Sequence, residues 1–116
     1  IEDQPVTLTI KKGDIIEIEG GDYAEKLRKT LEWAKQHAKH PERATKICEF
    51  GLGTNPSSQL IGTTILDEKC LGTCHLAIGS NAWFGGSLYS KIHLDQVLKD
   101  PTVYVDDVEL PSVKDL

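Results

Sequence analysis

The sequence is poor in cysteine and aromatic residues, and it contains no long apolar run. Three cysteines in 116 residues, an odd number, are unlike the paired framework of a small secreted domain, so we expect a reducing, cytoplasmic location. No stretch approaches the roughly 20 consecutive apolar residues of a membrane helix, and no charged and then apolar leader is visible. We therefore expect no membrane contact.

Positive charge is scarce as well. The chain has 13 lysine and arginine residues against 18 acidic ones, a formal net charge of −5. No basic cluster is long enough to follow a phosphate backbone, so nucleic acid is not an expected partner. The apolar share of 39% is that of an ordinary globular protein, and 116 residues suffice for one core. We therefore expect residues 1–116 to form a single domain.

Alternating apolar residues predict β-strands at both ends of the chain. Residues 6–19 are typical of a β-hairpin with Ile16 and Ile18 on its apolar face, and residues 103–110 of a shorter one. Three further strands are predicted at residues 47–53, 73–78 and 91–97. The apolar run at residues 60–66 is too short to distinguish a helix from a strand.

A long helix from Asp22 to about Lys39 is predicted by apolar residues three or four positions apart. These residues are Tyr23, Leu27, Leu31, Ala34 and Ala38. Asp22 and Glu25 resemble a capping box at the start of the helix. The expected fold is therefore α+β, with a mixed or antiparallel sheet and one long amphipathic helix.

Polar residues interrupt three of the predicted strands. Residues 93–95 read His-Leu-Asp, and because alternate residues of a strand share a face, His93 and Asp95 can bind one cation together. His75 and Glu49 also lie opposite apolar side chains of their own strands, where a polar group needs a partner. We expect a divalent metal ion to be the shared partner of all four. An edge strand with Glu49 in water is the alternative.

These ligand types leave the reaction open. Two histidines and one carboxylate form the facial triad of Fe(II) enzymes, whereas additional carboxylates admit zinc, manganese or cobalt, and a second ion if one of them bridges. Such a site activates either water for hydrolysis or dioxygen for ring cleavage.

Three segments, in the same order along the chain, resemble a known family. They read CEFGLGTNP from residue 48, DEKCLGTCHLAIGSN from residue 67 and FGGSLYSKIHLD from residue 84. Together they are similar to the C-terminal part of the aminopeptidase T family of thermophilic metallopeptidases, which includes relatives of leucyl aminopeptidase and aminopeptidase S. The similarity covers about residues 46–108.

The resemblance implies a hydrolase that releases N-terminal amino acids from peptides with metal-activated water. It implies a dinuclear site of zinc, cobalt or manganese, in which Glu49, His75, His93 and Asp95 match ligand positions, and it gives Glu68 a catalytic role. A first glutamate ligand of that family has no counterpart here, and a tyrosine of some members is replaced by Ala82.

The same resemblance implies partners. The chain would be the C-terminal domain of a larger two-domain metallopeptidase, with an N-terminal domain and a second, identical subunit as neighbours. Without that N-terminal domain, the isolated chain is expected to be inactive.

Two other functions stay open. The same fold family includes an Fe(II) dioxygenase that opens dihydroxypyridine rings, with two histidines and one aspartate in the same motifs, and iron(II) is the cofactor in this alternative. The third possibility is an excised domain that folds and binds metal weakly without turnover.

Overall fold

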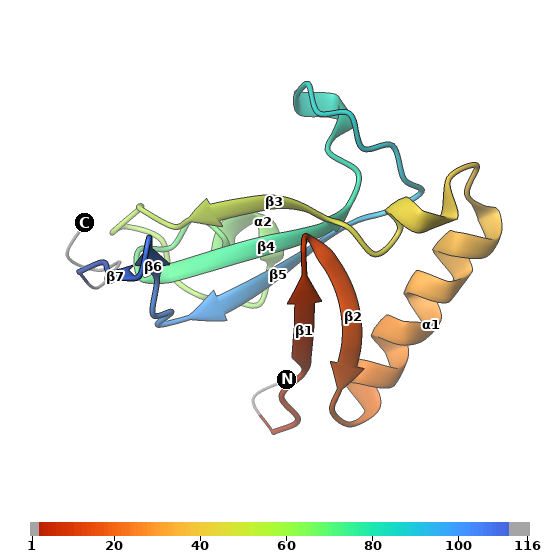
Figure 1. Cartoon of the computed structure of the whole chain (residues 1–116). Helices are drawn as coiled ribbons and strands as arrows, with labels where there is room; N and C mark the ends of the chain where they lie inside the picture. Colours follow the sequence, from red (N-terminus) through yellow and green to blue (C-terminus); the bar gives the residue numbers. More distant parts are fainter. Residues whose placement is uncertain (1–2, 112–116) are drawn as a thin grey trace. The chain divides into compact units, whose positions relative to one another are not determined.

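The computed structural model describes residues 3–111 and groups them into two compact units. Unit 1 comprises the described residues up to 48 together with residues 78–94, and unit 2 comprises residues 49–77 and those from 95 onward. Figure 1 labels the elements along the chain. These are β1 (Thr7–Lys11), β2 (Asp14–Glu19), α1 (Asp22–His37), η1 (Pro41–Arg43), β3 (Ile47–Leu52), α2 (Thr64–Asp67), β4 (Thr73–Gly79), η2 (Ala82–Phe84), β5 (His93–Lys99), β6 (Tyr104–Val105) and β7 (Val108–Glu109).

The N-terminal hairpin of unit 1 contains a β-bulge that the sequence pattern does not reveal. β1 and β2 pair antiparallel, but the register shifts between Thr9 and Ile10, which leaves Ile16 without a partner in β1. An extra residue inverts the alternation of side chains beyond it. Ile15 is consequently buried, at 8% exposure, whereas Ile16 is 60% exposed. The prediction that Ile16 belongs to the apolar face is therefore wrong.

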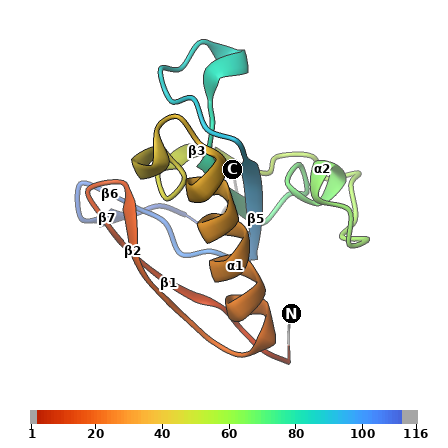
Figure 2. The same ribbon diagram turned by 90° about the vertical axis from the view of Figure 1, so that its right-hand side faces the viewer.

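Helix α1 packs on this hairpin in both views (Figures 1 and 2). Leu31 forms the apolar core of unit 1 together with Ile15 and Ile78. The helix also buries Ala24 and Ala34, whereas Tyr23 is 42% exposed, so the buried stripe is shifted by one residue at the start of the helix. The shift buries the small side chain of Ala24 in place of that of Tyr23.

The start of α1 differs from the expected capping box. The N-cap residue is Gly21, which has no side chain with which to cap the helix. Instead, the backbone N–H of Asp22 donates to Oε1 of Gln4, 3.0 Å away. A glutamine that is distant in sequence thus satisfies one of the unpaired N–H groups of the first turn.

Strands β3, β4 and β5 form a three-stranded sheet in that order, which Figure 1 shows. Hydrogen bonds from Gly53 N–H to the Thr73 carbonyl and from Gly79 N–H to the Lys46 carbonyl mark the two ends of the β3–β4 pairing. Because the residue numbers rise on one strand as they fall on the other, the strands run antiparallel. Six of the seven residues of β4 are buried, as expected for a central strand.

Unit 2 is organised around polar groups. The Asp67 carboxylate at the end of α2 accepts hydrogen bonds from the backbone N–H groups of Ile61 and Gly62, at 2.8 and 3.0 Å. The ambiguous run at residues 60–66 therefore forms a loop that leads into the short helix α2. Near the C-terminus, β6 and β7 make the second predicted hairpin.

The described residues thus form a small α+β fold with antiparallel sheets and, within residues 3–111, one long helix. This coarse prediction is confirmed. None of the helices within the described residues is long and apolar enough to cross a membrane.

Candidate metal centre

Three neighbouring strands of the sheet each contribute one side chain to a cluster within unit 2. Glu49 lies on β3, His75 on β4 and Asp95 on β5. Each offers one ligand atom, and these atoms all lie within 4.8 Å of one another. The structure therefore brings together three of the four residues that the sequence predicts as ligands.

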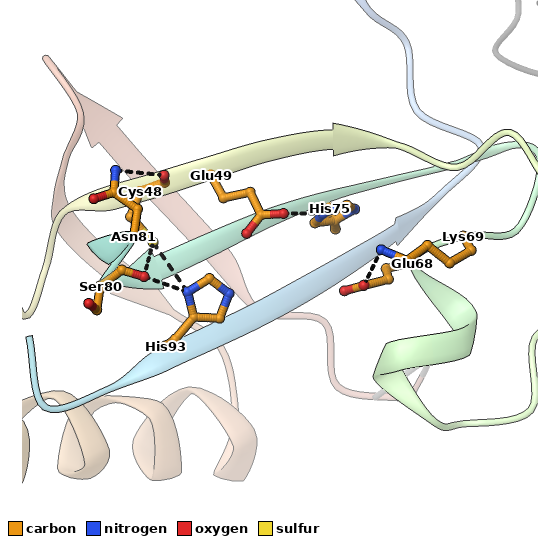
Figure 3. Close-up of polar contacts among 8 residues, drawn as sticks. All are labelled: Cys48, Glu49, Glu68, Lys69, His75, Ser80, Asn81 and His93. Atoms are coloured by element: carbon orange, nitrogen blue, oxygen red, sulfur yellow. Dashed lines mark hydrogen bonds and ion pairs between the residues drawn. The ribbon is translucent and has the colours of Figure 1, made fainter. Parts of the chain in front are cut away.

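His75 is the most buried member of this group, with 4% exposure. Its Nε2 lies 3.0 Å from Oε1 of Glu49. Figure 3 marks this contact with a dashed line. Its Nδ1 is also buried, and it has no hydrogen-bond partner among the described residues. A buried polar atom without a partner costs about 1–3 kcal/mol, so the imidazole is suited to a further ligand.

Gly51 makes room for this imidazole. It lies on β3, and a Cβ atom placed there would lie 2.2 Å from Cε1 and 2.7 Å from Nε2 of His75. No real side chain tolerates such distances, so any other residue at position 51 must displace the ring. A glycine inside a strand often indicates such a close approach. The sequence contained that signal, but our prediction did not use it.

A lysine ammonium lies within electrostatic range of the carboxylates of the group. The hydrogen bond to Glu68 raises the pKa of the Lys69 ammonium, burial lowers it by less, and the charges of Glu49 and Asp95 add to the rise. Lys69 Nζ lies 2.5 Å from Oε1 of Glu68, whose side chain is only 12% exposed. Glu68, predicted as catalytic, is thus an ion-pair partner of Lys69 and not a member of the metal-ligand group.

His93 is not a member of the group either. It lies in unit 1, where its Nδ1 is 2.6 Å from the Ser80 carbonyl oxygen (Figure 3). A carbonyl only accepts hydrogen bonds, so Nδ1 is the donor in this contact. Sγ of Cys48 lies 3.7 Å from His93 Nδ1. The ring of Trp83 packs against the His93 ring, with the two ring centroids 4.2 Å apart.

The gathered donors suit one hard or borderline divalent cation. Two carboxylates and one imidazole provide oxygen and nitrogen ligands of the kind that iron(II), manganese or zinc accept. The unpartnered nitrogen of His75 is consistent with a ligand that the protein atoms do not supply. Three side chains are enough for one ion, and the number of ions stays a prediction.

Comparison with known proteins identifies the family. A family model described as NicX, 2,5-dihydroxypyridine 5,6-dioxygenase, matches residues 1–113. A solved structure of 2,5-dihydroxypyridine dioxygenase from Pseudomonas putida KT2440 is similar, with a TM-score of 0.74 and 27% sequence identity. That match covers 91% of this chain and 32% of the solved chain, so the chain spans about a third of the length of this relative. No curated protein is detectably similar.

These matches overturn the predicted aminopeptidase. The resemblance to the aminopeptidase T family, the hydrolase and protease activity, and the two-domain metallopeptidase parent are wrong, because the matching family is one of dioxygenases. The physical reason for the error is that histidine and carboxylate ligands on strands serve both chemistries. Similar short motifs therefore indicate which residues are able to bind a metal ion. They do not decide whether the metal activates water or dioxygen.

The predicted partners are corrected with the activity. A peptide substrate, an aminopeptidase N-terminal domain and the homodimer were all inferred from the metallopeptidase resemblance, as was the inactivity of the isolated chain. None of them is supported by a dioxygenase match. Since the family model covers nearly the whole sequence, the chain belongs to the 2,5-dihydroxypyridine 5,6-dioxygenase family.

Proposed function

We propose that this chain carries the metal-binding part of an iron(II)-dependent dioxygenase that opens the ring of 2,5-dihydroxypyridine or a close analogue. The observation that carries the proposal is that residues 1–113 match the dioxygenase family and contain the group Glu49, His75 and Asp95. Iron(II) at a histidine and carboxylate site is typical of non-haem oxygenases. A cytoplasmic location remains a prediction from the cysteine content.

The proposed reaction balances without a second reductant. Breaking the bond between ring carbons C5 and C6 adds one atom of dioxygen to each carbon. The hydroxyl-bearing C5 becomes a carboxyl group, and C6 becomes a formyl group on the former ring nitrogen. The electrons that reduce dioxygen come from the ring itself. Bound iron(II) would supply the one-electron chemistry that dioxygen needs to react with such a ring.

The proposed iron ligands are the three residues that the structure gathers. His75 is held over Gly51, and together with Glu49 and Asp95 it offers the donor atoms. His93 stays a ligand proposed from the sequence, because it precedes Asp95 by two residues on β5.

Lys69 is the proposed partner of the substrate. The hydrogen bond to Glu68 and, to a smaller extent, the charges of Glu49 and Asp95 raise the pKa of its ammonium, which is therefore protonated at neutral pH. A cation there stabilises the negative charge that a ring hydroxyl of the substrate acquires when it loses its proton. Glu68 positions Lys69 through their ion pair. We expect Glu68→Gln to raise KM for the ring more than it lowers kcat, since the iron ligands stay intact.

The test uses the full chain, purified without oxygen and loaded with iron(II). Bound iron, oxygen uptake and the loss of 2,5-dihydroxypyridine absorbance are measured together. The proposal expects oxygen and substrate to disappear in equal molar amounts. In His75→Ala, iron affinity is expected to fall about 10–100-fold or more, the scale for damage to a metal site.

His37→Ala is the matched control. His37 is an exposed histidine at the end of α1 and lies outside the metal-ligand group. This variant should keep both the iron affinity and the oxygen uptake of the original chain. A chain that binds no iron(II), or that binds it and consumes no oxygen with the dihydroxypyridine, would contradict the proposal.

A further inference from the structure

A pocket in unit 1 has no part in the proposed oxygenase chemistry. Its volume is about 390 Å³, within the range of small-molecule sites. Two separate stretches of chain line it, one following α1 and one preceding β5. The lining residues that matter here are Lys39, His40, Arg43, Tyr89, Ser90 and Lys91.

The lining is strongly basic. Lys39, Arg43 and Lys91 are cationic at neutral pH, and none of the residues that line the pocket is acidic. Such a concentration of positive charge runs against the formal net charge of −5 for the whole chain. The nearby Glu42 is 63% exposed, and its Oε1 lies 3.7 Å from Arg43 Nε and from His40 Nδ1. One exposed carboxylate does not neutralise three cations.

Ser90 provides a second, independent observation. Its Oγ atom is buried and has no hydrogen-bond partner among the described residues. A buried hydroxyl without a partner is uncommon in folded proteins and calls for an explanation such as an additional ligand. Ser90 lines the pocket, and a rotation of its side chain would bring this hydroxyl to a ligand bound there.

The helix dipole explains only part of this arrangement. Basic side chains near the C-terminal end of a helix stabilise it, and Lys35 and His37 occupy the last turn of α1. The same effect accounts for Lys39. It does not account for Lys91 or for the buried hydroxyl of Ser90, which come from a different part of the chain.

We propose that this pocket binds a small, doubly charged oxyanion, the chemistry that a phosphate ester and a dicarboxylate share. The guanidinium of Arg43 offers parallel N–H donors to two oxygen atoms, and the lysines contribute point charges. The Ser90 hydroxyl donates to a further oxygen. The site shares no residue with the metal-ligand group. Its test is therefore independent of the test of the dioxygenase proposal.

The test is a titration of the ¹⁵N-labelled full chain with inorganic phosphate, and in a second arm with succinate, at constant ionic strength. Saturable shifts of the amide resonances of residues 38–40, 42–43 and 89–91 are expected, and the tighter of the two ligands distinguishes the phosphate from the dicarboxylate source. Lys91→Gln should raise Kd about tenfold, the scale of one lost charge-assisted contact. Ser90→Ala should raise it about threefold, because a neutral donor contributes less.

Lys11→Gln is the matched control, because Lys11 is an exposed lysine of unit 1 that does not line the pocket. It removes the same charge and should leave Kd unchanged. Lys91 is exposed, so Lys91→Gln should retain the fold, which its amide spectrum verifies. The proposal is overturned if neither ligand produces saturable shifts at these amides, if chloride produces the same shifts, or if Lys11→Gln weakens binding as much as Lys91→Gln.

Discussion

The two units bury different kinds of side chain. Unit 1 has an apolar core in which Leu31 meets Ile15 and Ile78. In unit 2 the most buried residues are mainly polar or sulfur-containing, with one alanine: Asp67, Cys70, Thr73, Cys74, His75 and Ala77. Apolar contacts stabilise a fold without regard to direction, whereas every buried polar group requires a specific partner. Unit 1 is therefore built for stability, and unit 2 is built to present a polar site.

The largest expected effect comes from the apolar core of unit 1. Leu31 is 3% exposed, and Leu31→Ala removes its contacts and leaves a cavity. The free energy of unfolding should fall by about 2–5 kcal/mol, measured by urea denaturation. Tyr23→Ala, on the exposed side of the same helix, should change it by less than about 0.5 kcal/mol. An equal loss of unfolding free energy in the two variants would contradict the assignment of Leu31 to the core and of Tyr23 to the surface.

The corresponding change in unit 2 is Gly51→Ala. The added methyl group would clash with the His75 ring, which must then move from its place beside Glu49. Iron(II) affinity should fall about 10–100-fold, measured by anaerobic titration. Phe50→Ala alters the preceding residue of β3, which is 55% exposed, and should leave iron affinity unchanged. Unchanged affinity in Gly51→Ala would show that His75 has more room than the structure gives it.

One of the two buried thiols of unit 2, that of Cys74, should make stability depend on pH. Burial raises the pKa of Cys74 above its ordinary value of 9.0. The unfolded chain therefore loses this proton at lower pH than the folded chain does, so stability is complete below about pH 9 and falls as the pH rises further. The slope is at most about 1.4 kcal/mol per pH unit, the value for one proton. Urea denaturation at a series of pH values measures this dependence. The free energy of unfolding should fall less steeply with rising pH in Cys74→Ala than in the original chain.

The smallest expected effect is on the surface of unit 1. Glu25 pairs with Arg28 at 2.7 Å and with Lys29 at 3.7 Å, and all three side chains are at least 43% exposed. Glu25→Gln should therefore reduce the free energy of unfolding by about 1 kcal/mol or less. Thermal denaturation in low and high salt measures the difference, which should shrink as salt screens the charges. A loss as large as that of Leu31→Ala would contradict this ranking.

Most of the secondary structure could be predicted because it follows from local patterns. The long helix and the strands of the central sheet lie close to their predicted positions, since the spacing of apolar residues reflects which side of an element is buried. The errors at Ile16 and Tyr23 have a common cause. The bulge in β2 depends on pairing with β1, and the buried side of α1 depends on which residues fit against the core. Neither is visible in a single segment.

The site could be predicted only as a set of candidates. Glu49, His75 and Asp95 were recognisable as polar residues within apolar strands, and their role as iron ligands stays a prediction. Their proximity follows from the strand order β3-β4-β5, which joins segments far apart in sequence. The reaction was assigned wrongly because the same ligand types activate water in one family and dioxygen in another.

By itself, the amino-acid sequence determined which segments become strands or helix and which side chains are chemically able to bind a metal. The tertiary structure decided which of those side chains meet, which face of each element is buried, and where cations gather around an unpartnered hydroxyl. The physical reason is distance along the chain. Propensity and periodicity act over a few neighbouring residues, whereas a binding site depends on contacts between segments that only folding brings together.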